Sequence, residues 1–455
     1  MLTRIEIDGF KSFEQFSLDV GPFLVIVGPN GSGKSNLFDA IQLLSRLASN
    51  DLRTAVSHLR GEPHELFRTA GRGPEADRIR LAVEVLLDPR VRDPWGTDVQ
   101  LSHTRVRYEV EIERRNDERG IERLFIVQEA ARPILSKKDA WRPAVCSSEG
   151  FRRAFMRYSR KSDLLSSTGE GDSRTFEIHQ DGKQGRKRPA QAAEATVLSS
   201  ITSTEFPHLF ALREEMRSWR FLHLDPAGLR EPSPTVAPDI LEPNGSNLAT
   251  VLARLWMETR SEDQPKGVLA EIVAALSSMV PGVLDVSVHE ERENRRYQVD
   301  LSMRDERPFS SRVVSDGTLR LLALLTLLHD PRHRGLVCFE EPENGVHPDR
   351  LKTLIPLLRS LVTDLEADAE DSDQPLSQML LNSHSPVVLS NLVDGEMMFA
   401  DLVSVIDPET KSIRRRTRMR PVKPRDQGEL ELNGEREYIS RFEVNRYLST
   451  ASTEA

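Results

Sequence analysis

FLVIVGPNGSGKSNLFDA, residues 23–40, joins an unbroken apolar run to a glycine-rich turn and then to one apolar helix face. Residues 28–35 fit the pattern G-x-x-x-x-G-K-[ST], with a predicted strand before them and a predicted helix after them. Glycines let backbone N–H groups turn inward around phosphates, and the first turn of the helix adds a positive dipole end. The sequence therefore predicts a phosphate-binding loop between a buried strand and a helix.

Each residue of this loop has a predicted part in binding ATP and Mg²⁺. Lys34 would reach the β- and γ-phosphates, and the hydroxyl of Ser35 would bind Mg²⁺. The other predicted nucleotide contacts are Asn30, Gly31, Ser32, Gly33 and Asn36. The alternative interpretation is a glycine-rich turn without a ligand.

A second apolar run, residues 336–339, ends in the carboxylates Glu340 and Glu341. In a parallel sheet this strand end would lie beside the phosphate loop, where Glu340 would hold Mg²⁺ and Glu341 would polarise the attacking water. The first acid at such a strand end is commonly Asp, and Glu340 is one methylene longer. The alternative is two exposed glutamates after a buried strand.

Two further polar motifs follow the same order along the chain. Ser315 and Gly317 open a long apolar helix, so a hydroxyl, a glycine and a helix N-terminus combine as a second anion-binding site. The alternative is a plain helix cap made by Ser315 or Thr318. His384 ends the strand after the acidic one, where a neutral imidazole would sense the γ-phosphate and orient water. A purely structural histidine is the alternative there.

The composition predicts a cytoplasmic chain with no membrane part. With 455 residues, 38% of them hydrophobic, the chain can build a sizeable core, and its net charge of -9 argues against a basic coat for indiscriminate nucleic-acid binding. Cys146 and Cys338 lie far apart, which indicates a reducing compartment without a disulfide framework. No apolar run approaches the roughly 18 residues of a membrane span, and the N-terminus lacks a signal-peptide core.

The pattern along the chain predicts four segments. Residues 1–130 form an N-terminal lobe with the phosphate loop and antiparallel strands, and 131–245 form a partly flexible insertion in which 161–198 is a polar loop. Residues 246–410 form a C-terminal lobe with the remaining motifs. Residues 411–455 form a tail that is first basic and then acidic to neutral.

The motifs GPNGSGKSNLFDA, SDGTLRLLALL, EEPENGVHP and NSHSP, in this order, resemble the compact ABC-type AAA ATPases of the RecF, SMC and OLD group. The resemblance covers residues 1–60 and 240–400, and it extends to ATPase subunits of bacterial anti-phage defence systems. It implies an α/β fold: an ABC-type ATPase head, made of a phosphate-loop parallel sheet and an antiparallel β subdomain, plus an inserted, mainly helical lobe.

The resemblance also implies roles for named residues. Ser315 and Gly317 would contact the γ-phosphate of ATP held by an opposing copy, and Glu341 would act only in that dimer. Lys11 and Ser12 would lie near the base or ribose.

A glutamine that binds Mg²⁺ is also expected in the N-terminal lobe. Gln128 is the favoured candidate, with Gln42 a poorer one. Asn344 and His347 would lie near the dimer seam.

The interval between the motifs narrows the choice of function. Nine prolines from Pro133 to Pro243 are incompatible with a long coiled coil. The chain after residue 400 is too short for the nuclease domain of OLD proteins, so a nuclease would be a separate effector. We expect an ATP-gated head dimer that controls DNA processing or anti-phage defence. The alternative is a slowly hydrolysing scaffold that holds a protein effector without DNA.

The basic cluster at residues 411–425 holds eight Lys and Arg residues and has two interpretations. It could contact DNA phosphates, or it could be a strand or tail with a charged face.

Overall fold

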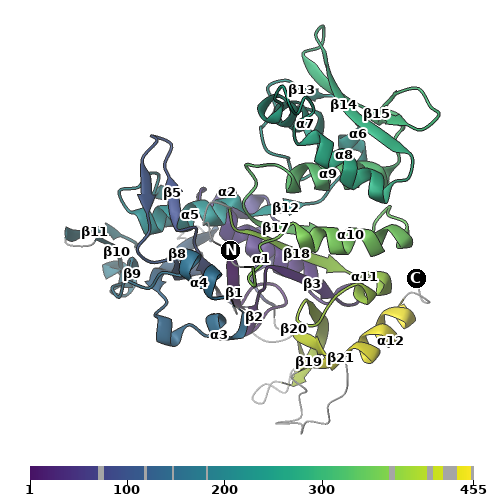
Figure 1. Cartoon of the computed structure of the whole chain (residues 1–455). Helices are drawn as coiled ribbons and strands as arrows, with labels where there is room; N and C mark the ends of the chain where they lie inside the picture. The colour runs from purple at the N-terminus through teal and green to yellow at the C-terminus, as the bar shows by residue number, and fades with distance from the viewer. Residues whose placement is uncertain are drawn as a thin grey trace.

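The computed structural model describes residues 1–69, 76–116, 120–145, 148–180, 183–367, 375–406, 413–423 and 438–451. Its centre is a seven-stranded sheet, seen near the middle of Figure 1. The strand order is β12 (Arg220–Leu222), β17 (Gly335–Glu340), β18 (Ser377–Ser383), β3 (Phe23–Val27), β19 (Met397–Ile406), β20 (Ile413–Lys423) and β21 (Ile439–Ser440). The first five strands are parallel, and β20 is antiparallel to β19.

The central sheet is buried on both faces, which explains its unbroken apolar runs. In β3, Leu24 and Ile26 belong to the core shared with helix α1 (Lys34–Leu47). Phe23, Val25 and Val27 belong to the core on the other face, which includes α9 (Asp316–Leu328) and α10 (Pro348–Ser360). The predicted buried strand before the phosphate loop and the helix after it are both present.

An eight-stranded antiparallel sheet covers the α1 side of the molecule (Figure 1). Its order is β11 (Lys183–Pro189), β10 (Thr175–Gln180), β9 (Leu165–Thr168), β8 (Glu122–Pro133), β7 (Arg105–Asn116), β4 (Arg78–Leu86), β1 (Leu2–Asp8) and β2 (Phe16–Asp19). Alternate side chains of this sheet pack with α1 and α5 (Pro207–Ser218) in one core. This is the antiparallel β subdomain expected from the resemblance.

The prediction that residues 161–198 form a loop is wrong, because β9, β10 and β11 lie there and extend the antiparallel sheet. Each of these strands buries few side chains, among them Leu165, Phe176 and Ile178, so the polar composition hid the alternation. The predicted segment boundary at residue 130 also falls inside β8. Residues 131–245 therefore contribute to both sheets.

The mainly helical lobe lies within residues 226–328, above the central sheet in Figure 1. Its helices are α6 (Pro226–Arg230), α7 (Leu248–Thr259), α8 (Leu269–Met279) and α9. They pack on a small sheet of β13 (Ser233–Pro234), β15 (Arg296–Met303), β14 (Val283–Glu291) and β16 (Phe309–Ser310). Besides short 3-10 turns, the remaining helices and strands of the described residues are α2 (Leu52–Ser57), β5 (Arg90–Arg92), β6 (Asp98–Gln100), α3 (Trp141–Val145), α4 (Glu149–Phe155), α11 (Pro386–Ser390) and α12 (Arg441–Ala451).

A buried carboxyl ties the antiparallel sheet to the chain that leads into α5. Glu129 of β8 has no exposed surface, and it accepts hydrogen bonds from Val197 N (2.5 Å), Leu198 N (3.0 Å) and the Tyr108 hydroxyl (3.0 Å). Burial raises the pKa of the Glu129 carboxyl from 4.5 to about 7, because the charged form loses its hydration. The folded protein therefore binds the proton of the Glu129 carboxyl more tightly than the unfolded chain does.

This proton makes stability depend on pH. The pKa of Glu129 in the folded protein lies above its value in the unfolded chain. The stability that the protonated carboxyl contributes is therefore fully present below pH 4.5 and is lost as the pH rises through 7. Relative to Glu129→Gln, the free energy of unfolding of the parent chain should fall by about 3 kcal/mol across this window. Denaturant titrations from pH 4.5 to 7.5 measure the difference. If the free energy of unfolding changes equally with pH in the parent chain and in Glu129→Gln, the prediction is wrong. The control is Glu122→Gln on the same strand, which should follow the parent chain.

Candidate functional site

Three parallel strands end side by side at one edge of the central sheet. Glu340 of β17 pairs with Asn382 of β18, and Asn382 pairs with Ile26 of β3. The next residues along these strands are therefore neighbours: Glu341, Ser383 and Val27, the last leading into the phosphate loop. The structure brings the predicted acidic pair and the predicted phosphate loop to one place.

The phosphate loop has the close packing that its glycines predict. Gly33, at the N-terminus of α1, has φ +95°, and a Cβ there would lie 2.1 Å from the Thr417 hydroxyl. A Cβ on Gly28 would lie 2.3 Å from the carbonyl oxygen of Ala400. Neither position has room for a side chain, and Gly33 also has a backbone conformation that L side chains rarely adopt.

The polar groups of the loop fit a phosphate ligand. The Ser32 hydroxyl is buried without a hydrogen-bond partner among the described residues, so an acceptor or donor from a ligand would satisfy it. Lys34 Nζ donates to the carbonyl oxygens of Gly28 (2.7 Å) and Pro29 (2.9 Å). Three more predicted contacts sit around them: Asn30 and Gly31 are exposed at the loop, and Ser35 is half-buried in the first helical turn.

Charge links Lys34 to the acidic strand. Burial lowers the pKa of the Lys34 ammonium, and the carboxylates of Glu341, Glu343 and Glu340 oppose that effect. The ammonium group and these carboxylates therefore share one electrostatic environment. Oxygen donors from Ser35 and Glu340 are the kind that Mg²⁺ prefers, so the donor set fits that ion.

Glu340 lies between two side chains from neighbouring strands. Its Oε1 accepts from Asn382 Nδ2 at 3.2 Å, and its Oε2 lies 3.9 Å from His223 Nδ1. Asn382 is 2% exposed. Its buried amide fixes the orientation of the carboxylate on the side that faces β18.

Glu341 is held in an unusual backbone conformation, with φ +51°. Its N–H donates to the carbonyl oxygen and the Oδ1 of Asn382, both at 3.1 Å. Its Oε2 accepts from Asn344 Nδ2 at 2.5 Å, while its Oε1 lies 3.8 Å from His384 Nδ1. A non-glycine residue at positive φ costs energy, and such strain is concentrated at functional sites. The structure thus places His384 beside Glu341.

Glu343 is a site residue that the sequence did not single out. Its Oε1 accepts from the Ser383 hydroxyl (2.7 Å) and from His384 N (3.0 Å), and it lies 3.5 Å from His384 Nδ1. The side chain is 9% exposed. Glu343 therefore positions the turn that carries His384. Glu343 could have been recognised from the sequence because it lies within the motif EPENGVHP.

Ser315 and Gly317 lie at the start of α9 in the helical lobe. Ser315 is the N-cap of α9 and accepts from Thr318 N at 3.4 Å, so the capping interpretation describes this chain. A Cβ on Gly317 would lie 1.9 Å from the carbonyl oxygen of Gly345, in the turn after Glu341. Ser315 itself is exposed. The helix start is thus packed on the acidic turn, while Ser315 itself stays exposed with its hydroxyl bonded to Thr318.

Lys11 and Ser12 lie behind the first turn of α1. The Ser12 hydroxyl accepts from Asn36 Nδ2 (2.9 Å) and shares a hydrogen bond with the Thr417 hydroxyl (2.7 Å). Lys11 Nζ donates to Asp39 Oδ2 at 2.6 Å. Lys11 is therefore paired within the chain, and the predicted residues Ser12 and Asn36 contact each other.

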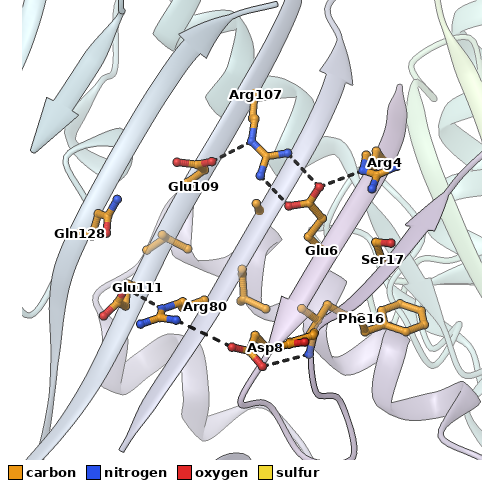
Figure 2. A pocket seen from close by; sticks show the side chains of 15 residues that line it. Arg4, Glu6, Asp8, Phe16, Ser17, Arg80, Arg107, Glu109, Glu111 and Gln128 are labelled. Carbon is orange, nitrogen blue, oxygen red and sulfur yellow. Dashed lines mark hydrogen bonds and ion pairs between the residues drawn. The ribbon is translucent and has the colours of Figure 1, made fainter. Parts of the chain in front are cut away.

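The structure does not bring Gln128 to the phosphate loop. Figure 2 shows its side chain on the outer face of the antiparallel sheet, on the strand next to Glu109 and Glu111. It lines a groove of about 500 Å³ together with Arg4, Glu6 and other charged residues. Gln42 of α1 lines a separate pocket with Trp219 and Pro243.

The described part of the basic cluster, residues 413–423, forms β20 with a charged face. Arg418 and Arg420 both contact Asp401 Oδ2, at 2.7 Å and 3.0 Å. Arg414 lies 3.6 Å from Glu14. The charged-strand interpretation therefore describes these residues, while the other four positions of the cluster and Cys146 lie outside the described residues. Within the described ranges, no helix is long and apolar enough to cross a membrane.

Comparisons with known proteins match different parts of the chain. The family model "AAA domain, putative AbiEii toxin, Type IV TA system" matches residues 157–390, and "RecF/RecN/SMC N terminal domain" matches residues 1–59. Chromosome partition protein Smc of Methanocaldococcus jannaschii is 52% identical over 54 residues, 11% of this chain and 5% of that protein. OLD nuclease of Thermus scotoductus is 43% identical over 44 residues, 10% of this chain and 8% of that protein. The chain spans less than a tenth of the length of these relatives.

A solved structure shares the fold over nearly the whole chain. The "Crystal structure of the SmcHead bound to the C-winged helix domain of ScpA" has a TM-score of 0.50 at 13% identity, covering 92% of this chain and 97% of that chain. The fold is that of an SMC head, as the sequence motifs predict.

The geometry of Lys34 leads to a direct test. Replacing Lys34 with Ala removes a buried ammonium group that interacts with the carboxylates of Glu341, Glu343 and Glu340, so the affinity for ATP should fall by about 100-fold or more. Titration with a fluorescent ATP analogue measures it. The control is Lys266→Ala, which removes an exposed lysine paired with Asp285 in the helical lobe. Unchanged affinity in Lys34→Ala would refute the phosphate loop.

Proposed function

The chain belongs to the AAA domain family whose model matches residues 157–390, and we propose that it is a Mg²⁺-dependent ATPase whose active site is completed by a second copy of the chain. The observation that carries the proposal is the meeting of Lys34, Glu340, Glu341 and His384 at one sheet edge. In the proposed site the phosphate loop binds the nucleotide, and the strand ends supply the groups for hydrolysis.

In this proposal each side chain has one task. Lys34 and the loop N–H groups bind the phosphates, while Ser35 and Glu340 hold Mg²⁺. When bound, Mg²⁺ neutralises charge on the phosphate oxygens. Glu341 takes the proton of the attacking water, with its carboxylate held by Asn344 at 2.5 Å. His384, positioned by Glu343, orients that water.

Two features support a second copy. The exposed Ser315 caps α9 in the helical lobe, whereas the phosphate loop leads into α1, which lies near the middle of the molecule (Figure 1). Gly317 packs on Gly345, one residue after the Asn344 that holds Glu341. A phosphate bound at Ser315 would therefore press on the turn that positions the proposed base. In this way dimer formation would switch hydrolysis on.

We place this switch in the control of DNA processing or anti-phage defence, through a separate effector such as a nuclease. The family description names a toxin system, and a matching relative is an OLD nuclease, which supports that setting. The alternative is a slow scaffold that retains a protein effector without DNA. The pairing of Arg418 and Arg420 with Asp401 favours this alternative at β20. Binding to duplex DNA that weakens steeply with salt would support the DNA role, and no binding at all would support the scaffold.

The association step has a sharp test. Glu341→Gln should bind ATP without turning it over and should accumulate as a dimer, measured by light scattering with saturating ATP. Adding Ser315→Arg to this variant places a bulky cation at the exposed helix cap, so the protein should bind ATP as a monomer.

The control for this test is Ser278→Arg, which changes another exposed serine of the same lobe and should leave the dimer intact. A Glu341→Gln protein that stays monomeric while saturated with ATP would refute the shared site. Dimers of unchanged stability in the Ser315→Arg double variant would remove Ser315 from the seam.

A further inference from the structure

The edge strand β12 brings a histidine to the acidic strand end. β12 is parallel to β17, with Leu222 paired to Phe339, so His223 follows directly beside Glu340. Its Nδ1 lies 3.9 Å from Glu340 Oε2, and its backbone N–H donates to the carbonyl oxygen of Pro243 at 2.9 Å. The backbone is therefore anchored, while the imidazole is 89% exposed at the site.

The two carboxylate oxygens of Glu340 have different surroundings. The buried Asn382 amide holds Oε1 by a hydrogen bond, whereas His223 lies near Oε2 at a distance beyond hydrogen-bond length. A 3.9 Å contact between an exposed imidazole and a carboxylate does not fix the ring. A cation held by Glu340 Oε2 would meet a ring nitrogen that is free to turn toward it.

We propose that His223 is a ligand of the metal that accompanies the nucleotide, next to Glu340. This inference rests on the proposed function, because the metal is the one bound with ATP. Neither glutamine that the sequence suggested as a metal ligand lies beside Glu340: Gln128 lies on the outer face of the antiparallel sheet, and Gln42 lines another pocket. His223 is the side chain that lies there instead.

An imidazole changes which metal the site prefers. Mg²⁺ selects oxygen donors and keeps several waters, whereas Mn²⁺ and later divalent ions accept imidazole nitrogen readily. The site should therefore favour Mn²⁺ over Mg²⁺ more strongly than a site of hydroxyl and carboxylate oxygens would. His223 is thus a specificity-determining residue for the metal.

Pulsed electron paramagnetic resonance tests this ligand without relying on turnover. The full chain is loaded with Mn²⁺ and a non-hydrolysable ATP analogue, with ordinary or ¹⁵N-labelled histidine. A nitrogen coupling that changes with the histidine label should appear in the parent chain and vanish in His223→Ala. Competition between Mn²⁺ and Mg²⁺ should show the preference for Mn²⁺ falling about 10-fold in this variant.

The matched control is His289→Ala, which removes another exposed histidine beside a carboxylate, 3.1 Å from Asp300 in the helical lobe. This variant should keep both the coupling and the preference for Mn²⁺. If the Mn²⁺–nucleotide complex binds but the parent shows no histidine coupling, or if His223→Ala binds Mn²⁺ more tightly, the inference is overturned and the proposed ATPase stands. Failure of the parent to bind any metal–nucleotide complex would overturn both.

Discussion

The candidate site depends on the register of three parallel strands at their carboxyl ends, where one buried amide on the middle strand, that of Asn382, bonds to the acidic strand. Asn382 pairs with Glu340 on one side and Ile26 on the other, and its side chain donates to Glu340 while accepting from Glu341 N. A shift of one residue in this register would turn the carboxylates to the opposite face of the sheet. The strand pairing therefore sets the relation between the phosphate loop and the acids.

Local sequence patterns predicted the strands that are followed at once by a polar motif. The apolar run before Gly28, the run that ends at Glu340 and the position of His384 were all readable, because each depends on a strand followed at once by a polar turn. The strands β9–β11 pair with one another as consecutive hairpins, yet the sequence did not predict them, because few of their side chains are buried and the alternation of polar and apolar residues is weak.

Side-chain placement was harder to predict than strand placement. The side of the antiparallel sheet on which Gln128 lies depends on how β8 pairs with β7. That pairing contains a register shift between Glu111 and Ile112, which no local sequence pattern predicts. The role of Glu343 depends on a contact with the next strand. His223 follows a three-residue edge strand, too short to be recognised from periodicity.

The turn that follows the acids joins the two halves of the proposed mechanism. Gly345 contacts Gly317 at the start of α9, and the neighbouring Asn344 holds Glu341. In the proposed mechanism this turn would link ligand binding near Ser315 to Glu341 through one packing contact, two adjacent residues and one hydrogen bond. Under that mechanism, association of two copies would act on Glu341 through this turn, without a large rearrangement of the sheet.

Cross-linking across the proposed seam tests the shared site most directly. One cysteine replaces the exposed Asn30 in the phosphate loop of one copy, and another replaces Ser315 in a second copy. Mixed chains treated with a short thiol cross-linker should yield a covalent dimer that requires ATP and both cysteines. A cross-link that forms equally without ATP, or none at ATP concentrations that saturate both chains, would contradict a nucleotide held between two copies.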